Sequence, residues 1–237
     1  MADSEPKIAL LAGATGLVGG HLLDALLESP AFGRVYAITR RPLGREHPRL
    51  ANRIVQFDKI EMQLKGLTCH VALCCLGTTI GQARSEQAFR QVDVDVVLAF
   101  ARAAKAAQAQ RFVFISSAGA NPNSKYFYLR VKGEVEQALA ALQFPSLDIL
   151  QPSQLLGWRR EPRFPEILGQ AFLPLFNPFL TGAREQWRAI SARTVARAML
   201  GVARSGRRGV YRYTYSSIRE LAKSKALRPV SPVETKT

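Results

Sequence analysis

Two kinds of hydrophobic pattern alternate along this chain. Short runs that are almost wholly apolar, such as KIALLA at residues 7–12, are typical of strands buried on both faces of a parallel sheet. Between them lie stretches in which apolar residues recur every three or four positions, as on one face of a helix. The first such stretch covers residues 15–30 and ends at a proline, and its apolar positions are Leu17, Leu22, Leu23, Leu26 and Leu27.

The same alternation continues toward the carboxyl terminus. Further strands are predicted at residues 34–42, 53–58, 70–77, 111–117, 147–153 and 209–215. Helices are predicted at residues 86–107, which are rich in alanine, and at residues 126–142. Strands that alternate with helices predict an α/β fold, here a Rossmann-type doubly wound parallel sheet of about seven strands in a single domain.

The predicted domain boundaries lie where this pattern stops. Residues 1–6 and 222–237 lack apolar periodicity, so we expect a disordered amino terminus and a flexible tail around one domain at residues 7–221. The segment at residues 159–181 mixes prolines with large apolar residues, and proline interrupts regular helices. It is an apolar lid over a substrate pocket, a cap that only covers the sheet, or a dimer contact, with shallow membrane association as a further alternative.

Three glycines lie where the first strand meets the first helix, in the pattern G-x-x-G-x-x-G. Glycine lets the backbone turn tightly and approach a pyrophosphate, and a helix amino terminus favours an anion. At this junction the spacing predicts a dinucleotide site, and the alternative is a turn that is merely tight. The predicted contacts are Gly13, Ala14, Thr15, Gly16, Leu17, Val18 and Gly19.

The end of the second predicted strand distinguishes the two nicotinamide cofactors. An acidic residue there would bind the ribose 2′-hydroxyl of NAD, but the chain has Thr39, Arg40 and Arg41. Because a guanidinium suits a 2′-phosphate, NADP(H) is the predicted cofactor, with Arg40 as the main contact and Arg41 either sharing it or facing solvent. Asp58, which ends the third predicted strand, either meets the adenine or caps a helix.

Charge and cysteine usage narrow the function classes. The 33 basic and 18 acidic residues give a net charge of +15, which could attract phosphate-bearing ligands, nucleic acid or an anionic membrane. No nucleic-acid docking motif accompanies this charge, so we do not predict a nucleic-acid partner. Cys69, Cys74 and Cys75 have no spacing for a disulfide framework or a metal site, and we expect buried free thiols and no metal.

The chain shows no pattern of a secretory signal peptide. No apolar run reaches the roughly 18 residues that span a bilayer, so no transmembrane segment is predicted. From these two observations we expect a cytoplasmic location.

A tyrosine and a lysine lie one helical turn apart in the predicted helix at residues 126–142. Tyr128 and Lys132 are separated by three residues, so their side chains share one face. The spacing also occurs by chance. An aromatic anchor beside a solvated lysine is therefore the alternative to a catalytic acid/base and its partner.

Taken together, the motifs resemble a known family. The segments CLGTT at residues 75–79, ISSAGA at 115–120, YLRVKGEVE at 128–136 and QPSQLLG at 151–157 occur in the order found in short-chain dehydrogenases/reductases. The chain is most similar to the atypical members related to the Tat-interacting oxidoreductase and to NAD-dependent epimerases. The resemblance extends over about residues 7–213.

The resemblance implies that Ser117, Tyr128 and Lys132 are catalytic. The tyrosine would give or take the proton at a carbonyl or alcohol oxygen while the nicotinamide exchanges hydride. Lys132 would favour the phenolate and hold the nicotinamide ribose. Ser117 would hydrogen-bond the substrate oxygen, and its neighbour Ser116 would be structural.

Further cofactor contacts are implied by the same resemblance. Cys75, Leu76 and Gly77 would pass beside the adenosine ribose, and Pro152 would lie near the nicotinamide. Two positions depart from the family pattern: Asp93 stands where an asparagine is common, and Gln151 where an arginine precedes the proline. These departures concern the proton relay and the set of substrates.

The function expected from the sequence is hydride transfer by an NADP(H)-dependent oxidoreductase acting on a small carbonyl or alcohol substrate. A cofactor-binding regulatory or redox-sensing scaffold with little turnover is one alternative, and a sugar-nucleotide epimerase-like enzyme is another. A homodimer or a protein partner stays an open alternative.

Overall fold

The computed structural model describes residues 5–78, 80–83, 85–157 and 180–224. The proline-rich segment predicted as a cap at residues 159–181 lies outside these ranges except for residues 180 and 181, as does the predicted tail from residue 225 onward. The last described helix ends at Lys223, two residues past the predicted domain boundary at 221. Regular structure therefore continues slightly further than the hydrophobic pattern indicates.

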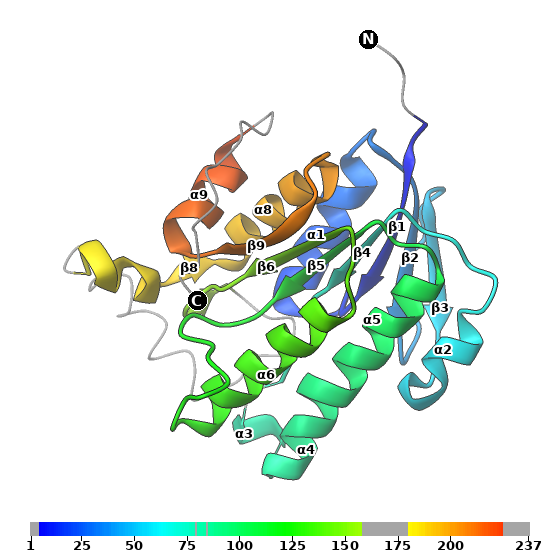
Figure 1. Ribbon diagram of the computed structural model, residues 1–237. Helices are drawn as coiled ribbons and strands as arrows, with labels where there is room; N and C mark the ends of the chain where they lie inside the picture. Colours follow the sequence, from blue (N-terminus) through cyan, green and yellow to red (C-terminus); the bar gives the residue numbers. More distant parts are fainter. Residues whose placement is uncertain (1–4, 79, 84, 158–179, 225–237) are drawn as a thin grey trace.

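A seven-stranded parallel sheet forms the centre of the protein, in the order β3-β2-β1-β4-β5-β6-β9 (Figure 1). The strands are β1 (Lys7–Ala12), β2 (Phe32–Thr39), β3 (Leu50–Ile54), β4 (Val71–Cys74), β5 (Arg111–Ile115), β6 (Ser146–Leu150) and β9 (Gly209–Tyr213). Two further short strands, β7 (Leu155–Leu156) and β8 (Ile190–Ser191), pair with each other. The central strands β4, β5 and β6 are buried almost throughout, because helices cover both faces of the sheet.

The helices divide between the two faces of the sheet. The longer ones are α1 (Leu17–Glu28), α5 (Val97–Ala106), α6 (Phe127–Ala141), α8 (Ala192–Arg204) and α9 (Tyr215–Lys223), and the shorter ones are η1 (Phe57–Lys59), α2 (Ile60–Gln63), α3 (Ile80–Ala83), α4 (Glu86–Arg90), η2 (Gln91–Val96) and η4 (Gly182–Trp187). One apolar cluster packs α1, α8 and α9 against the sheet, and a second packs α2, α5 and α6 against the opposite face (Figure 1). The predicted doubly wound α/β fold is confirmed.

The third strand differs from the prediction of residues 53–58. The strand is β3 at Leu50–Ile54, and the chain then turns into η1. Because β3 is an edge strand with only partly buried and exposed residues, it lacks the apolar run that marks the buried strands. Asp58 consequently lies in η1 and not at the end of a strand.

The helix predicted at residues 86–107 is interrupted. It begins as α4, continues as the π-helical turn η2 and ends as α5. Such turns inside α-helices are frequent at functional sites. The turn here places Asp93 in the interior, where its side chain is fully buried.

The other predicted strands are correctly located but end earlier than predicted. The last residues of the stretches at 34–42, 70–77, 111–117 and 147–153 leave the sheet and form loops at its carboxyl edge. The order of the strands reverses between β1 and β4, and in doubly wound sheets the ligand crevice lies at the carboxyl ends of the strands at this point. The fold therefore gathers the candidate site residues at one edge.

The junction between β1 and α1 is packed too tightly for a side chain at Gly19. A Cβ atom on Gly19 would lie 1.9 Å from the carbonyl oxygen of Gly13. A Cβ atom on the adjacent Gly20 would lie 3.7 Å from the carbonyl oxygen of Ala14, which is an ordinary contact. The helix can approach the turn this closely only with glycine at position 19.

We predict opposite effects of alanine at these two positions. Gly19→Ala forces α1 away from the turn and destabilises the protein by about 1–3 kcal/mol, as overpacking does. Gly20→Ala has room in a helix and is neutral or stabilising by up to about 1 kcal/mol. Thermal unfolding of both variants measures the difference, and an equal loss of Tm in the two would contradict the packing argument.

Candidate functional site

The glycine turn after β1 touches the end of β4. Gly13 has a φ of +86°, and a Cβ atom on it would lie 2.6 Å from the carbonyl carbon and oxygen of Cys75. The amide of Gly16 donates to the Gly13 carbonyl oxygen at 2.9 Å and closes the turn. Two of the predicted cofactor segments, residues 13–19 and 75–77, are therefore neighbours.

The amino terminus of α1 has the features of an anion site. Gly16 is its N-cap residue and supplies no capping side chain, and the first turn has no acidic residue. The free amide groups of a helix amino terminus and the helix dipole favour a phosphate group. Together with the cradle that a Cβ atom on Gly13 or Gly19 would fill, they fit the pyrophosphate of a dinucleotide.

Arg40 and Arg41 directly follow the last residue of β2, and both are exposed. The side chain of Asn52 fixes the chain on both sides of them. Its Nδ2 donates to Thr39 Oγ1 at 2.7 Å, and its Oδ1 accepts from the amide of Leu43 at 2.9 Å. Within the described ranges neither arginine forms an ion pair with a carboxylate.

A buried ion pair lies beside the loop that follows β4. Lys132 Nζ, on α6, donates to Asp93 Oδ1 at 2.6 Å, and the amide of Thr78 donates to Asp93 Oδ2 at 2.8 Å. Lys132 is 4% exposed and Asp93 is fully buried. A Cβ atom on Gly77 would lie 3.5 Å from Lys132 Nζ, so the lysine lies directly against this loop.

The charge of Lys132 is maintained by its partner. Burial by itself would lower the pKa of the ammonium group, but the negative charge of Asp93, followed by Tyr128, raises this pKa above its ordinary value. Lys132 therefore stays positively charged at neutral pH. The asparagine common in the family at position 93 would supply a hydrogen bond but no compensating charge.

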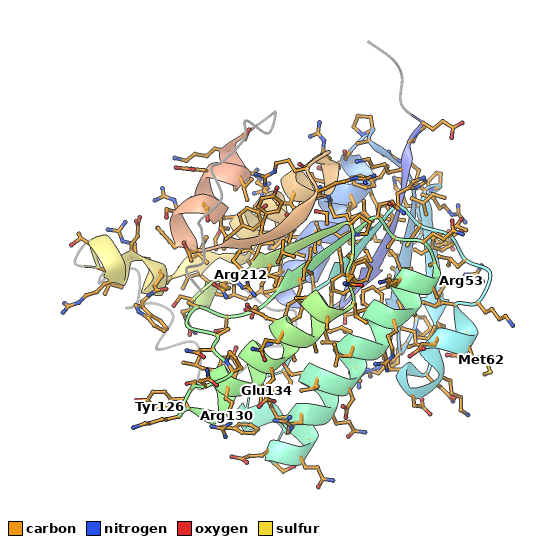
Figure 2. The ribbon with its side chains drawn as sticks, viewed as in Figure 1. Arg53, Met62, Tyr126, Arg130, Glu134 and Arg212 are labelled. Atoms are coloured by element: carbon orange, nitrogen blue, oxygen red, sulfur yellow. The ribbon has the colours of Figure 1, made fainter. Side chains whose placement is uncertain are left out.

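Tyr128 lies in the first turn of α6, beside the lysine. Lys132 Nζ is 5.9 Å from the centroid of the Tyr128 ring, and the Phe89 ring packs against the same tyrosine with the centroids 5.7 Å apart. Among the described residues no group hydrogen-bonds the Tyr128 hydroxyl. Tyr126, by contrast, is 75% exposed and points outward at the start of the helix (Figure 2).

The two serines after β5 have different surroundings. Ser116 is buried, and its Oγ donates to Glu136 Oε1 at 2.5 Å. The same carboxylate accepts hydrogen bonds from Gln151 Nε2 at 2.8 Å and from Arg212 Nε at 2.9 Å. Ser117 is half-buried, and its Oγ makes only a long contact of 3.4 Å to the carbonyl oxygen of Ala118.

The loop that carries Ser117 is attached to both neighbouring elements. The amide of Ala118 donates to the carbonyl oxygen of Pro152 at 2.9 Å, which connects it to the segment after β6. A Cβ atom on Gly119 would lie 3.5 Å from Leu129 Cδ1 on α6 and 2.7 Å from Trp187 Cη2. Trp187 is 44% exposed and borders this loop; only its aromatic character in an arginine-rich stretch marks it in the sequence.

The candidate residues thus fall into two groups. The turn at residues 13–19, the loop at 75–77, Tyr128 and Lys132 form a continuous chain of contacts, and the loop with Ser117 and Pro152 adjoins the first turns of α6. Arg40 and Arg41 lie one strand away, after β2, and Asp58 lies beyond them in η1, exposed. Glu136 and Trp187, which contact the loop after β5, are not among the site residues predicted from the sequence.

Two kinds of feature do not occur in the described part of the chain. No group of three or more His, Cys, Asp or Glu side chains there could hold a metal ion. No helix there is long and apolar enough to cross a bilayer.

The cysteines are free, and burial raises the pKa of the Cys69 and Cys74 thiols to about 12.

We predict that Asp93→Asn makes stability depend on pH near neutrality. In the wild type the pKa of Lys132 is raised above 10.5, so its contribution is complete at lower pH and is lost only as pH rises through the folded-state value. Without the carboxylate, burial lowers the pKa of Lys132, and stability then increases with pH because the unfolded chain binds more protons. The variant should lose about 3–5 kcal/mol at neutral pH.

Thermal unfolding between about pH 7 and pH 10 measures this effect, and the difference in Tm from the wild type should narrow as pH rises. Asp95→Asn, at an exposed position of the same π-helical turn, is the matched control and should follow the wild type. Parallel curves for Asp93→Asn and the wild type would contradict the assigned role of the carboxylate.

The sequence profile of the NAD dependent epimerase/dehydratase family matches residues 9–134. Protein HTATIP2 of Rattus norvegicus is 37% identical over 199 residues, which is 82% of this chain and 80% of that protein. Protein FMP52, mitochondrial, of Candida glabrata is 40% identical over 65% of this chain and 66% of its own length. Protein fmp52, mitochondrial, of Aspergillus fumigatus is 34% identical over 81% of this chain and 84% of its own length.

Solved structures show the same fold at low identity. MoeE5 in complex with UDP-glucose and NAD has a TM-score of 0.64 at 18% identity, over 90% of this chain and 79% of that one. The ADP-L-glycero-D-manno-heptose-6-epimerase of Helicobacter pylori has a TM-score of 0.66 at 16% identity, over 92% and 82%. From the profile and the relatives, this chain belongs to the NAD dependent epimerase/dehydratase family, among the atypical short-chain dehydrogenases/reductases with an NAD(P)-binding Rossmann fold.

Proposed function

We propose that the protein is an NADP(H)-dependent oxidoreductase that transfers hydride to or from a carbonyl or alcohol, with Tyr128 as the acid/base. The observation that carries this proposal is the position of Lys132. Its ammonium group is buried, ion-paired with Asp93, next to Gly77 in the predicted cofactor loop and beside the Tyr128 ring. A fixed positive charge beside a phenol stabilises the phenolate that forms when Tyr128 gives up its proton.

Each residue then has a task that its surroundings permit. A bound nicotinamide supplies or accepts the hydride. The Tyr128 hydroxyl gives the proton to the substrate oxygen, and the charge of Lys132 stabilises the phenolate left behind. Ser117, whose hydroxyl is weakly engaged, donates a hydrogen bond to the same substrate oxygen. Ser116 is held by Glu136 and keeps a structural role in this scheme.

The preference for NADP(H) rests on the loop after β2. Arg40 and Arg41 are exposed there, the loop is fixed by Asn52, and residues 39–45 contain no Asp or Glu. A guanidinium at this place stabilises a 2′-phosphate by charge-assisted hydrogen bonds, whereas the ribose hydroxyl of NAD offers it little. Asp58, exposed in η1, is kept as a proposed adenine contact.

The two alternatives predict different outcomes in the same assay. A regulatory or redox-sensing protein would bind NADPH tightly without turning over carbonyl compounds. An epimerase-like enzyme would act on a sugar nucleotide and require no net oxidation.

The fungal relatives are named as mitochondrial proteins, and the cytoplasmic location expected from the sequence stays a prediction.

We predict that Tyr128→Phe lowers kcat for reduction of a responsive aldehyde or ketone by about 10²- to 10⁴-fold, because the general acid is removed. The Kd of NADPH should stay within a factor of about two, since only one hydroxyl is lost. Turnover is followed by NADPH oxidation across a panel of carbonyl compounds, with UDP-glucose as a separate arm for epimerisation.

Tyr126→Phe removes the same hydroxyl from an exposed ring two residues away and should leave kcat unchanged. If NADPH binds tightly and the whole panel gives no turnover, the regulatory alternative replaces the enzyme. If Tyr128→Phe and Tyr126→Phe are equally active, Tyr128 is not the acid/base.

We predict that Arg40→Gln weakens NADPH binding by about 10- to 100-fold and NADH binding by much less, because one charge-assisted contact to the 2′-phosphate is lost. Fluorescence titration of both cofactors measures the ratio of the two Kd values. Arg34→Gln changes an exposed arginine at the opposite end of the same strand and serves as the control. Equal Kd values of the wild type for NADPH and NADH would refute the preference.

A further inference from the structure

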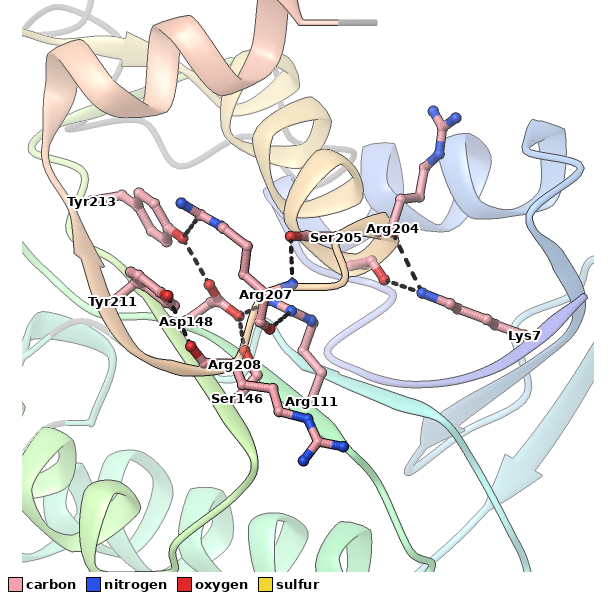
Figure 3. A network of polar contacts seen from close by, with 11 residues as sticks. Lys7, Arg111, Ser146, Asp148, Arg204, Ser205, Arg207, Arg208, Tyr211 and Tyr213 are labelled. Atoms are coloured by element: carbon pink, nitrogen blue, oxygen red, sulfur yellow. Dashed lines mark hydrogen bonds and ion pairs between the residues drawn. The ribbon is translucent and has the colours of Figure 1, made fainter. Parts of the chain in front are cut away.

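A second cluster of charge lies at the amino edge of the sheet, opposite the dinucleotide edge. A cavity of about 240 Å³ opens there, between the first residues of β1, β4, β5 and β6 and the loop between α8 and β9. The residues that matter in its lining are Lys7, Arg111, Ser146, Ser205, Arg207 and Arg208 (Figure 3). None of them belongs to the site proposed for the cofactor and substrate.

The charge of this cavity is strongly unbalanced. Among the described residues, four lining side chains are cationic and no Asp or Glu lines the cavity. The carboxylate of Asp148 is fully buried and forms an ion pair with Arg111. Its oxygens also accept hydrogen bonds from Ser146 Oγ at 3.0 Å and Tyr213 Oη at 2.8 Å. Asp148 therefore neutralises Arg111, and among the described residues no carboxylate pairs with Lys7 or Arg208.

Lys7 experiences this imbalance directly. Among the described residues its Nζ makes only two hydrogen bonds, both long at 3.5 Å, to the carbonyl oxygens of Ala203 and Arg204 (Figure 3). Burial, followed by the positive charges of Arg111 and Arg204, lowers the pKa of its ammonium group. Within the described ranges no carboxylate forms an ion pair with Lys7 or with Arg208. A bound anion would relieve the repulsion among these groups.

The cationic loop is also held in place before any anion arrives. Arg111 donates to the carbonyl oxygen of Arg207, and the Arg207 amide donates to Ser205 Oγ at 3.2 Å. The Arg207 guanidinium donates to Tyr213 Oη at 2.6 Å and lies 4.4 Å from the centroid of the Tyr211 ring (Figure 3). Preorganised donors reduce the entropy lost on binding.

We propose that this cavity is a second anion site, which takes a small tetrahedral oxyanion: inorganic phosphate or the phosphate group of a small phosphomonoester. Arginine and lysine donors suit the oxygens of phosphate. The cavity is smaller than the roughly 300–1,000 Å³ of usual small-molecule sites, which favours a compact anion over a nucleotide. The bound phosphate joins Lys7 on β1 to the α8–β9 loop and stabilises the folded protein.

The test is thermal unfolding at constant ionic strength, with phosphate, a phosphomonoester such as glycerol phosphate, or chloride as the anion. Phosphate at ten times its Kd should raise the Tm of the wild type by about 3 °C, and the rise should continue with the logarithm of the phosphate concentration, as binding to one site requires. Lys7→Gln and Arg208→Gln should abolish the rise. Arg208 is exposed, so its replacement leaves the fold intact.

Two control variants locate the effect. Arg197→Gln, at an exposed position of α8 outside the cavity, and Arg40→Gln, in the proposed cofactor site, should keep the full rise. A rise that survives in Lys7→Gln and Arg208→Gln, that is lost in Arg40→Gln, or that chloride reproduces would overturn the proposal. So would a response to RNA or another polyanion without one to phosphate.

A rise in Tm with either inorganic phosphate or glycerol phosphate supports the anion site. The larger of the two rises shows which of these ligands the site prefers. Lys7→Gln and Arg208→Gln lie at the opposite edge from Tyr128 and should keep the wild-type Kd for NADPH and the wild-type kcat. These measurements can therefore refute the proposed anion site without affecting the oxidoreductase proposal, and the carbonyl assay can refute the oxidoreductase proposal without affecting the anion site.

Discussion

The ion pair between Lys132 and Asp93 is the interaction on which the arrangement of the candidate site depends. Two charges in a dry interior are costly unless each compensates the other, and here the carboxylate also accepts the amide hydrogen bond of Thr78. The pair therefore fixes three elements at once: the π-helical turn η2, the loop after β4 and α6. Because Tyr128 lies one turn before Lys132 on α6, its position relative to the predicted dinucleotide loop follows from the same contact.

The positive potential at the two edges of the sheet has different sources. At the carboxyl edge the positive potential comes from a helix amino terminus, backbone amides, one compensated lysine and the exposed side chains of Arg40 and Arg41. At the amino edge it comes from arginine and lysine side chains around one cavity, where Asp148 pairs with Arg111 and no described carboxylate pairs with Lys7 or Arg208. The net charge of +15 is therefore not spread evenly over the protein. At the amino edge of the sheet, the excess of positive charge is concentrated around one cavity.

The sequence predicts most where a local rule applies. The run of residues 7–12 coincides with β1, and the glycine spacing correctly places a tight turn before α1, because buried strands and close helix contacts leave strong patterns. It does not predict η2, since no residue pattern distinguishes a π-helical turn from the α-helix around it, nor the true limits of the exposed edge strand β3. The sequence also does not predict the contacts of Glu136 and Trp187, because the partners of these residues are distant in the chain.

Glu136 illustrates how the geometry of the candidate site depends on residues without a proposed chemical task. It lies one turn after Lys132 on α6, and its carboxylate accepts hydrogen bonds from Ser116 after β5, Gln151 after β6 and Arg212 on β9. Such a buried acceptor joins the helix to three neighbouring strands of the sheet, and each donor in turn satisfies a lone pair that would be costly to bury alone. Ser116 is engaged by this carboxylate, whereas the Oγ of Ser117 makes a long contact of 3.4 Å to the carbonyl oxygen of Ala118 among the described residues. The proposal that Ser117, and not Ser116, binds the substrate oxygen therefore rests on where a buried carboxylate finds its donors.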